Sequence, residues 1–85
     1  MKRLYSVFGK LWDETTETVM LQDAPLAEAK NSLKERTEFF RGHGFRVLSD
    51  KDQADNMPRI IVKNPANGRQ EAWFWIRETG QRSAA

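Results

Sequence analysis

Aromatic and basic residues alternate near the end of the chain, in a spacing that could form a binding surface. Trp73, Trp75 and Arg77 occupy every second position. Because successive side chains of a β-strand point to opposite faces of a sheet, these three side chains are expected on one face. Trp and Arg dominate the binding energy of protein interfaces, and aromatic side chains flanked by arginine also stack the bases of single-stranded nucleic acids. The pattern therefore predicts binding rather than catalysis.

The other residues that could do chemistry form no recognisable catalytic or metal site. A calcium-binding loop that began at Asp50 would need an oxygen ligand at its fifth position and glutamate at its twelfth, where the sequence has Ala54 and Ile61. The single histidine, His43, lies between two glycines, and the local sequence supplies no base partner for it. The chain has no cysteine, which excludes disulfides and thiolate chemistry. We therefore expect no enzymatic activity, no metal and no cofactor.

The length and composition are those of one small folded domain. The chain has 85 residues, 39% hydrophobic and 31% charged, which is too apolar for a disordered tail and too short for two cores. No apolar run approaches the roughly 20 residues of a membrane-spanning helix. The basic start of the chain is followed by too short an apolar stretch for a secretory signal. We therefore expect a cytoplasmic protein that does not bind membranes.

The charge balance favours a protein partner over a nucleic acid. Lys and Arg number 14 against 12 Asp and Glu, a formal net charge of +2. No block of five or six like charges occurs anywhere in the chain.

The aromatic content is high for so small a core, with 3 Trp, 5 Phe and 1 Tyr. Part of this apolar surface is therefore expected to lie outside the core.

The first third of the chain predicts a β-hairpin. Residues 3–12 and 17–22 are rich in aromatic and β-branched residues and flank a polar turn. Gly9, inside the first strand, is expected to mark a β-bulge. The first strand is apolar on both faces, with Tyr5 and Val7 on one and Leu4 and Phe8 on the other.

An amphipathic helix is expected over about residues 24–42. Asp23 is the predicted N-cap, and Pro25 fits the first turn, where its missing N–H costs nothing. Apolar and small residues recur along one stripe of the helix. Gly44 is expected to end the helix in a left-handed conformation, followed by an apolar contact from Phe45.

The second half predicts a short third strand over residues 45–48, a polar loop, and a second hairpin formed by residues 58–63 and 70–78. Its turn is either a two-residue Asn67-Gly68 loop or a three-residue loop that includes Ala66. We prefer the three-residue loop, because both faces of the hairpin then carry matched pairs. It pairs Ile60 with Phe74 and Val62 with Ala72 in the core, and Arg59 with Trp75, Ile61 with Trp73 and Lys63 with Glu71 on the opposite face.

These elements predict an α+β fold in the order β-β-α-β-β-β, with one helix on one face of an antiparallel sheet of four or five strands. Residues 1–78 are expected to form the domain, and residues 79–85 a disordered C-terminal tail. Because one helix covers only one face of a sheet, the second face is either shielded within the fold or exposed as a binding surface.

We expect a small non-enzymatic module that binds a protein partner, or a second copy of itself, through this aromatic face. Small size, no cofactor signature and an aromatic patch are typical of accessory or inhibitor proteins of phages and mobile elements. The alternative is a single-stranded nucleic-acid or RNA-binding domain that uses the same face. The residues expected to contact the partner are Trp73, Trp75, Arg77, Arg59, Ile61, Lys63 and Tyr5.

Overall fold

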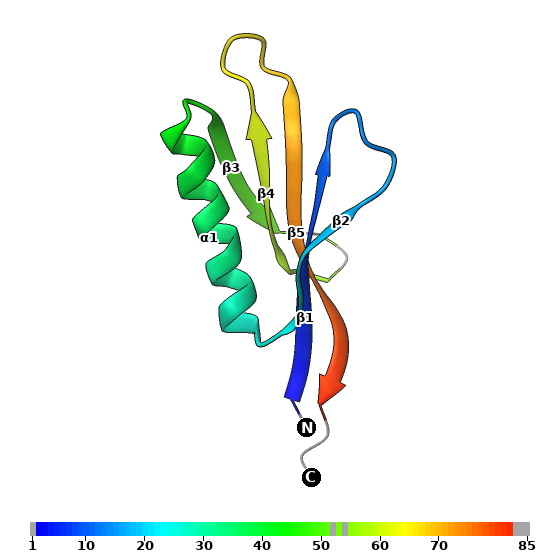
Figure 1. The fold of residues 1–85 in the computed structure, drawn as a ribbon. Coiled ribbons are helices and arrows are strands. Elements are labelled where there is room, and N and C mark those ends of the chain that lie inside the picture. Colours follow the sequence, from blue (N-terminus) through cyan, green and yellow to red (C-terminus); the bar gives the residue numbers. More distant parts are fainter. Residues whose placement is uncertain (1, 52, 54, 83–85) are drawn as a thin grey trace.

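One α-helix packs on a five-stranded antiparallel sheet in the computed structural model, which describes residues 2–51, 53 and 55–82 (Figure 1). The strands lie side by side in the order β2-β1-β5-β4-β3. The α+β class and the predicted order of elements are confirmed. The elements are β1 (Lys2–Leu11), β2 (Thr18–Ala24), α1 (Leu26–Gly42), β3 (Arg46–Lys51), β4 (Pro58–Lys63) and β5 (Gln70–Arg82).

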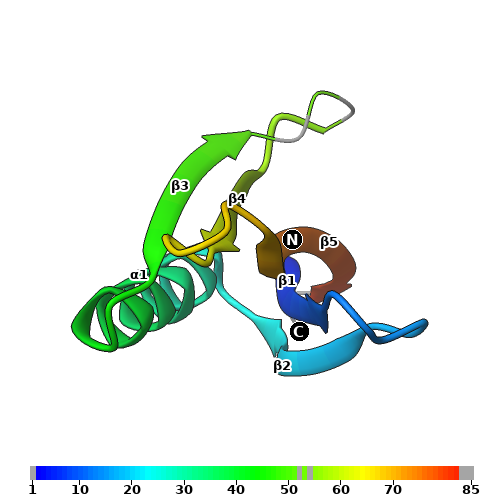
Figure 2. The ribbon, with the colours of Figure 1, turned by 90° about the horizontal axis from the view of Figure 1, so that it is seen from above.

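The core lies between α1 and the concave face of the sheet. Figure 2 shows the sheet curving around the helix, with β3 on one side of α1 and β2 on the other. The helix contributes Ala29 and Leu33 as its buried residues. The strands contribute alternate positions, as a period of two requires. These strand residues are Tyr5, Val7, Val47, Ile60, Val62, Ala72, Phe74 and Ile76.

The sequence predicts the end of α1 but not its beginning. Gly44 has a φ of +86°, as expected. The backbone N–H of Phe45 donates to the Phe40 carbonyl at 2.9 Å, and their rings meet edge to face with centroids 5.7 Å apart. The prediction of Asp23 as N-cap is wrong, because Pro25 is the N-cap and makes no side-chain hydrogen bond. Asp23 instead belongs to β2, with a φ of +48°.

Gly9 is required by close packing rather than by a bulge. The register shifts between β1 and β2 lie between Tyr5 and Phe8, so the prediction of a bulge at Gly9 is wrong. A Cβ at Gly9 would lie 2.7 Å from Cδ1 of Phe74 and 2.8 Å from Cε of Met20. Carbon atoms that are not bonded pack at about 3.5–4.0 Å. A side chain at this position would therefore displace its neighbours.

Gly9→Ala is expected to lower the free energy of unfolding by about 1–3 kcal/mol, because an extra methyl group in a packed core forces side chains out of place. Urea denaturation of the variant and the wild-type protein measures this. Gly42→Ala is the matched control, since nothing lies within 4 Å of a Cβ built there. It should leave stability unchanged or raise it. Equal stability of Gly9→Ala and the wild-type protein would contradict the packing described.

The second hairpin has the predicted core register but a longer turn. Gly68 has a φ of +70°, and the Asn64 N–H donates to the Arg69 carbonyl at 2.9 Å. Four residues rather than three therefore lie between the paired ends. Glu71 is an extra residue in β5, so Lys63 pairs with Gln70 and the predicted pair with Glu71 is wrong. The other four predicted pairs are confirmed: Arg59 with Trp75, Ile60 with Phe74, Ile61 with Trp73, and Val62 with Ala72.

Two strands continue three or more residues past their predicted ends. β3 continues to Lys51 instead of stopping at residue 48. β5 continues to Arg82 instead of stopping at residue 78, so the prediction of a disordered tail is wrong for residues 79–82. The rest of that tail, residues 83–85, lies outside the described residues, as do residues 52 and 54 of the predicted loop.

Polar contacts, which the apolar pattern cannot indicate, hold the last part of β5. The Thr79 hydroxyl donates to Asp23 Oδ1 at 2.7 Å and lies 2.7 Å from the Ser6 hydroxyl. Ser6 Oγ also accepts the backbone N–H of Asp23 at 3.0 Å. This network joins β5, β1 and β2, and it explains why β5 extends past the last apolar residue.

Candidate binding face

Six of the seven residues predicted to bind a partner lie on the convex face of the sheet, the side opposite α1. Their direction follows from the register, because neighbours at alternate positions, such as Ile60 and Phe74, are in the core. Within the described residues, no helix covers this face. The six residues are Arg59, Ile61 and Lys63 of β4, and Trp73, Trp75 and Arg77 of β5.

Tyr5, the seventh predicted residue, lies elsewhere. Its side chain is only 9% exposed and belongs to the core cluster with Val7. Phe8 pairs with Trp75 and therefore lies on the convex face, where it is an aromatic residue of β1. Tyr5 is a core residue rather than a contact residue. The sequence had already placed Phe8 on the opposite face from Tyr5, but it did not indicate which of these two faces packs against the helix.

An apolar row crosses three strands of the convex face. Leu48 of β3 pairs with Ile61 of β4, and Ile61 pairs with Trp73 of β5. Leu48 is 37% exposed, and what matters is that it continues a row of apolar side chains rather than its own exposure. Lys10 of β1 follows Trp73 in the register. We refer to Leu48, Ile61 and Trp73 as the apolar row; the sequence did not predict Leu48 as a member, although it alternates with buried Val47.

The second aromatic group stacks beside this row. The rings of Phe8 and Trp75 have centroids 6.1 Å apart with an angle of 23° between their planes. The Arg77 guanidinium lies 5.6 Å from the centroid of the Phe8 ring, within the range of a cation–π contact. The aromatic rings and the arginine therefore form a packed surface rather than a set of separate projecting side chains.

The two tryptophans and two arginines enclose a shallow hollow of about 130 Å³, lined by Arg59, Trp73, Phe74, Trp75 and Arg77. Nε1 of Trp75 is buried and has no hydrogen-bond acceptor among the described residues. A buried donor without a partner costs about 1–3 kcal/mol. Buried polar groups that lack a hydrogen-bond partner often occur at functional sites. A hollow of this volume has room for about one side chain.

Asp50 of β3 holds one side of Arg59. Nε of Arg59 donates to Oδ1 of Asp50 at 2.6 Å, and Nη2 donates to Oδ2 at 2.9 Å. These hydrogen bonds, helped by the attraction between the charges and opposed by desolvation, lower the pKa of the Asp50 carboxyl below its usual value of 3.8. The pair fixes the guanidinium at the edge of the hollow.

Arg59→Gln is expected to raise the pKa of Asp50 towards its usual value, because the bidentate partner is lost. An NMR titration of the Asp50 carboxyl carbon measures this. Since the pKa is depressed in the folded state, the pair stabilises the fold above the unfolded-state pKa, and this stabilisation is lost as pH falls through the folded-state pKa. Both side chains are well exposed, so it amounts to less than about 1 kcal/mol. An unchanged titration midpoint in the variant would contradict this account.

Further observations bear on the kind of site. Comparisons with protein-family models, curated proteins and solved structures found no match. Within residues 2–51, 53 and 55–82, no three acidic or histidine side chains gather where they could hold a metal ion. In the same residues, no helix has the length and apolar character needed to cross a membrane.

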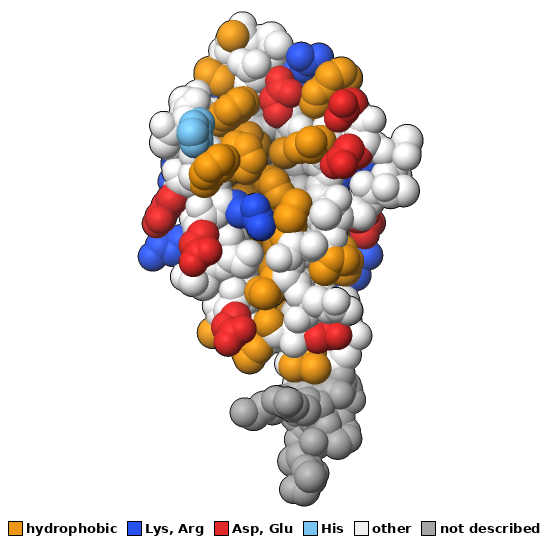
Figure 3. Space-filling view, viewed as in Figure 1, with side chains coloured by type: hydrophobic (Ala, Val, Ile, Leu, Met, Phe, Trp, Pro, Cys, Tyr) orange, Lys and Arg blue, Asp and Glu red, His pale blue; other side chains and the backbone are white. Residues whose placement is uncertain are grey.

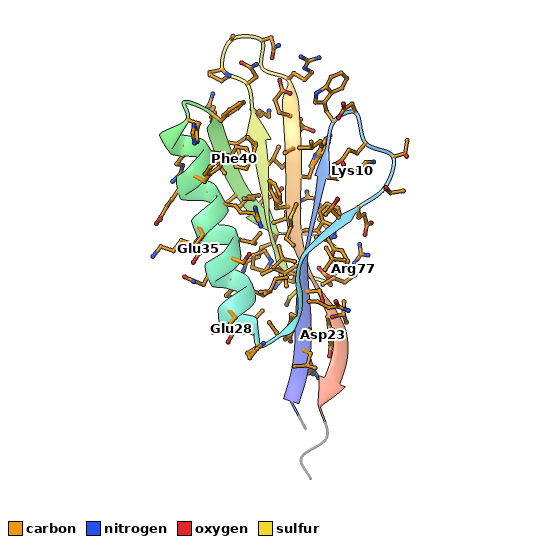
Figure 4. All side chains as sticks on the ribbon, in the orientation of Figure 1. Lys10, Asp23, Glu28, Glu35, Phe40 and Arg77 are labelled. Atoms are coloured by element: carbon orange, nitrogen blue, oxygen red, sulfur yellow. The ribbon has the colours of Figure 1, made fainter. Side chains whose placement is uncertain are left out.

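The structure also contains an apolar groove that the sequence did not predict. Figure 3 shows hydrophobic side chains in a band between α1 and β2, on the helix side of the sheet. Phe40 extends from α1 toward the sheet (Figure 4), and Trp12 and Phe39 are 51% and 59% exposed. One helix is narrower than a curved five-stranded sheet, so part of the concave face stays open. A cavity of about 280 Å³ at one end of this groove is lined by Leu11, Trp12, Asp13, Phe40, Phe45, Glu71 and Ala72.

Proposed function

We propose that this chain is a small protein-binding module whose partner, another protein or a second copy of the chain, docks on the convex face of the sheet. The apolar row of Leu48, Ile61 and Trp73 forms the centre of the contact. The side chains of Arg59 and Arg77 border it and supply directional hydrogen bonds. This arrangement of an apolar centre with a polar rim is the usual anatomy of a protein interface.

The apolar row is the observation that supports this proposal. Leu48 and Ile61 are aliphatic and lie in register beside Trp73. A surface that stacks bases gains its affinity from aromatic rings and cations, and aliphatic side chains add little to it. Burial of aliphatic surface against another protein is favourable by about 25 cal/mol per Å². A row that mixes aliphatic and aromatic residues therefore fits a protein partner better than a nucleic acid.

A single-stranded nucleic acid is the second candidate, because cations surround the aromatic residues on this face. Lys10 pairs with Trp73, and Arg46 pairs with Lys63 at the far end of the same side. Arg77 lies against Phe8. Such cations could contact phosphates. A salt titration with single-stranded oligonucleotides separates the candidates: affinity that falls steeply with rising salt supports nucleic acid, and no binding at low salt eliminates it.

Site-specific photo-crosslinking tests the proposal directly. Benzoylphenylalanine is placed at Ile61, in the apolar row, and in a second variant at Glu38, which is exposed on α1. After irradiation of the purified chain and of an extract of its source cells, we expect crosslinked species from the probe at Ile61 that the probe at Glu38 does not give. A dimer of the chain would identify a second copy as the partner. The same products from both positions, or from neither, would overturn the proposal.

A further inference from the structure

The edge of the sheet at β3 is open and regular. Within the described residues, β3 is the last strand on its side of the sheet. All six of its residues pair with β4 in an uninterrupted antiparallel register. The other edge strand, β2, pairs with β1 through two register shifts, and bulges of this kind discourage strand addition. A regular edge without bulges leaves backbone N–H and C=O groups as a template for a further strand.

The flank of α1 beside this edge is basic. Lys30, Lys34 and Arg41 are exposed and line a groove of about 450 Å³ between α1 and the β3–β4 hairpin. Figure 2 shows how α1 and β3 form the two sides of this region. Nη2 of Arg41 donates a hydrogen bond to the Val47 carbonyl at 3.4 Å, so this cation lies against β3 and already engages one of its carbonyl groups.

No free acidic group offsets these cations among the residues that line the groove. Its acidic member is Asp50, which is engaged by Arg59 at 2.6 and 2.9 Å. The opposite flank of α1 has a different character, since Glu28 and Glu35 line the groove toward β2. The positive charge is therefore concentrated beside the open edge, and an acidic ligand is its electrostatic complement.

We propose that the β3 edge accepts an extended segment of a protein partner as a sixth strand, and that acidic and apolar side chains alternate along this segment. Backbone hydrogen bonds to β3 would supply much of the affinity. The alternating side chains of the added segment would supply the specificity. Acidic side chains on the helix side meet Lys30, Lys34 and Arg41. Apolar side chains on the other side extend the apolar row beyond Leu48, and in this respect the inference rests on the proposed function.

A synthetic peptide tests this inference. The probe is a fluorescein-labelled, end-capped heptapeptide of alternating glutamate and valine, and its binding is followed by fluorescence anisotropy at low salt. We expect saturable binding by the wild-type protein and about five- to tenfold weaker binding by Lys34→Glu, since an attraction becomes a repulsion. Arg3→Glu changes the net charge equally, but Arg3 is exposed on β1, which lies three strands away from β3, so this variant should bind as the wild-type protein does. Hydrogen exchange at the β3 amides should slow when the peptide is bound.

Three results would overturn the inference. The first is equal binding of a peptide of the same composition whose glutamates and valines stand in two blocks, because it would mean electrostatic adsorption without strand addition. We expect this block peptide to bind more weakly than the alternating one. Tighter binding of an octamer of deoxythymidine, with the same loss in Lys34→Glu, would assign the basic flank to nucleic acid. No binding of the alternating peptide at millimolar concentration would leave the edge without this role. None of these results affects crosslinking at Ile61, so failure of the edge and failure of the convex face are distinguishable.

Discussion

Phe74→Ala is expected to lower the free energy of unfolding by about 3–5 kcal/mol, the usual cost of removing a buried phenylalanine ring. Phe74 is 3% exposed, and its ring lies 5.7 Å from that of Phe40 and 5.4 Å below the Arg36 guanidinium. It also fills the space that Gly9 leaves open. Small domains have about 5–15 kcal/mol of stability in total, so this one change removes a large fraction of it. Urea denaturation followed by circular dichroism measures the loss.

Phe39→Ala is the matched control for that experiment. Phe39 is 59% exposed on α1 and contacts Phe40 and His43 at the surface. The same deletion of a ring should therefore cost less than about 1 kcal/mol. If both variants lost the same stability, Phe74 would not be the central core residue, and the division between concave and convex faces would fail with it.

Trp73→Ala is expected to weaken association with the protein crosslinked at Ile61 by at least about 2 kcal/mol, or roughly 30-fold. Trp73 lies at the centre of the convex face, with Ile61 on one side and Lys10 on the other. The tryptophan side chain is only partly buried within the fold, so its loss should affect binding more than folding. Isothermal titration calorimetry measures the affinity, or sedimentation equilibrium if the partner is a second copy.

Trp12→Ala is the matched control for the affinity measurement, because it removes a tryptophan side chain at a different place on the surface. Trp12 is 51% exposed and lines the cavity at the end of the groove between α1 and β2, away from the convex face. It should leave the affinity within about twofold of the wild-type value. A Trp73→Ala variant that lost thermal stability but kept its full affinity would instead make Trp73 a structural residue.

The register of the second hairpin could be predicted from the sequence because two independent patterns agree there. Alternation places Ile60 and Phe74 on one face and Ile61 and Trp73 on the other, and Gly68 marks the left-handed position of the turn. The end of α1 was predictable for the same reason, since Gly44 and Phe45 form a local motif. Local chemistry determines both features, so no knowledge of the rest of the fold was needed.

The features that the sequence did not predict depend on distant contacts. Thr79 donates to Asp23, which lies 56 positions away in the sequence, and this contact helps to hold the end of β5. Asp23 belongs to β2 rather than to the start of α1. Tyr5 lies in the core. The sequence did not show this, because β1 is apolar on both faces and its pattern does not indicate which face is buried. The curvature of the sheet, which opens the groove between α1 and β2, likewise arises from the packing of all five strands. Six residues of the convex face could thus be predicted from the sequence. Only the structure shows that Leu48 and Phe8 belong to the same surface.

Oxidation of the three tryptophans tests the central claim most directly. Hydroxyl-radical footprinting with mass spectrometry compares the dilute purified chain with the chain inside its source cells. If the convex face binds a protein, Trp73 is oxidised in the purified chain and protected in the cell, while Trp12 is oxidised in both. Equal oxidation of Trp73 in the two settings would mean that nothing docks there, and would contradict the assignment of the convex face as the binding surface.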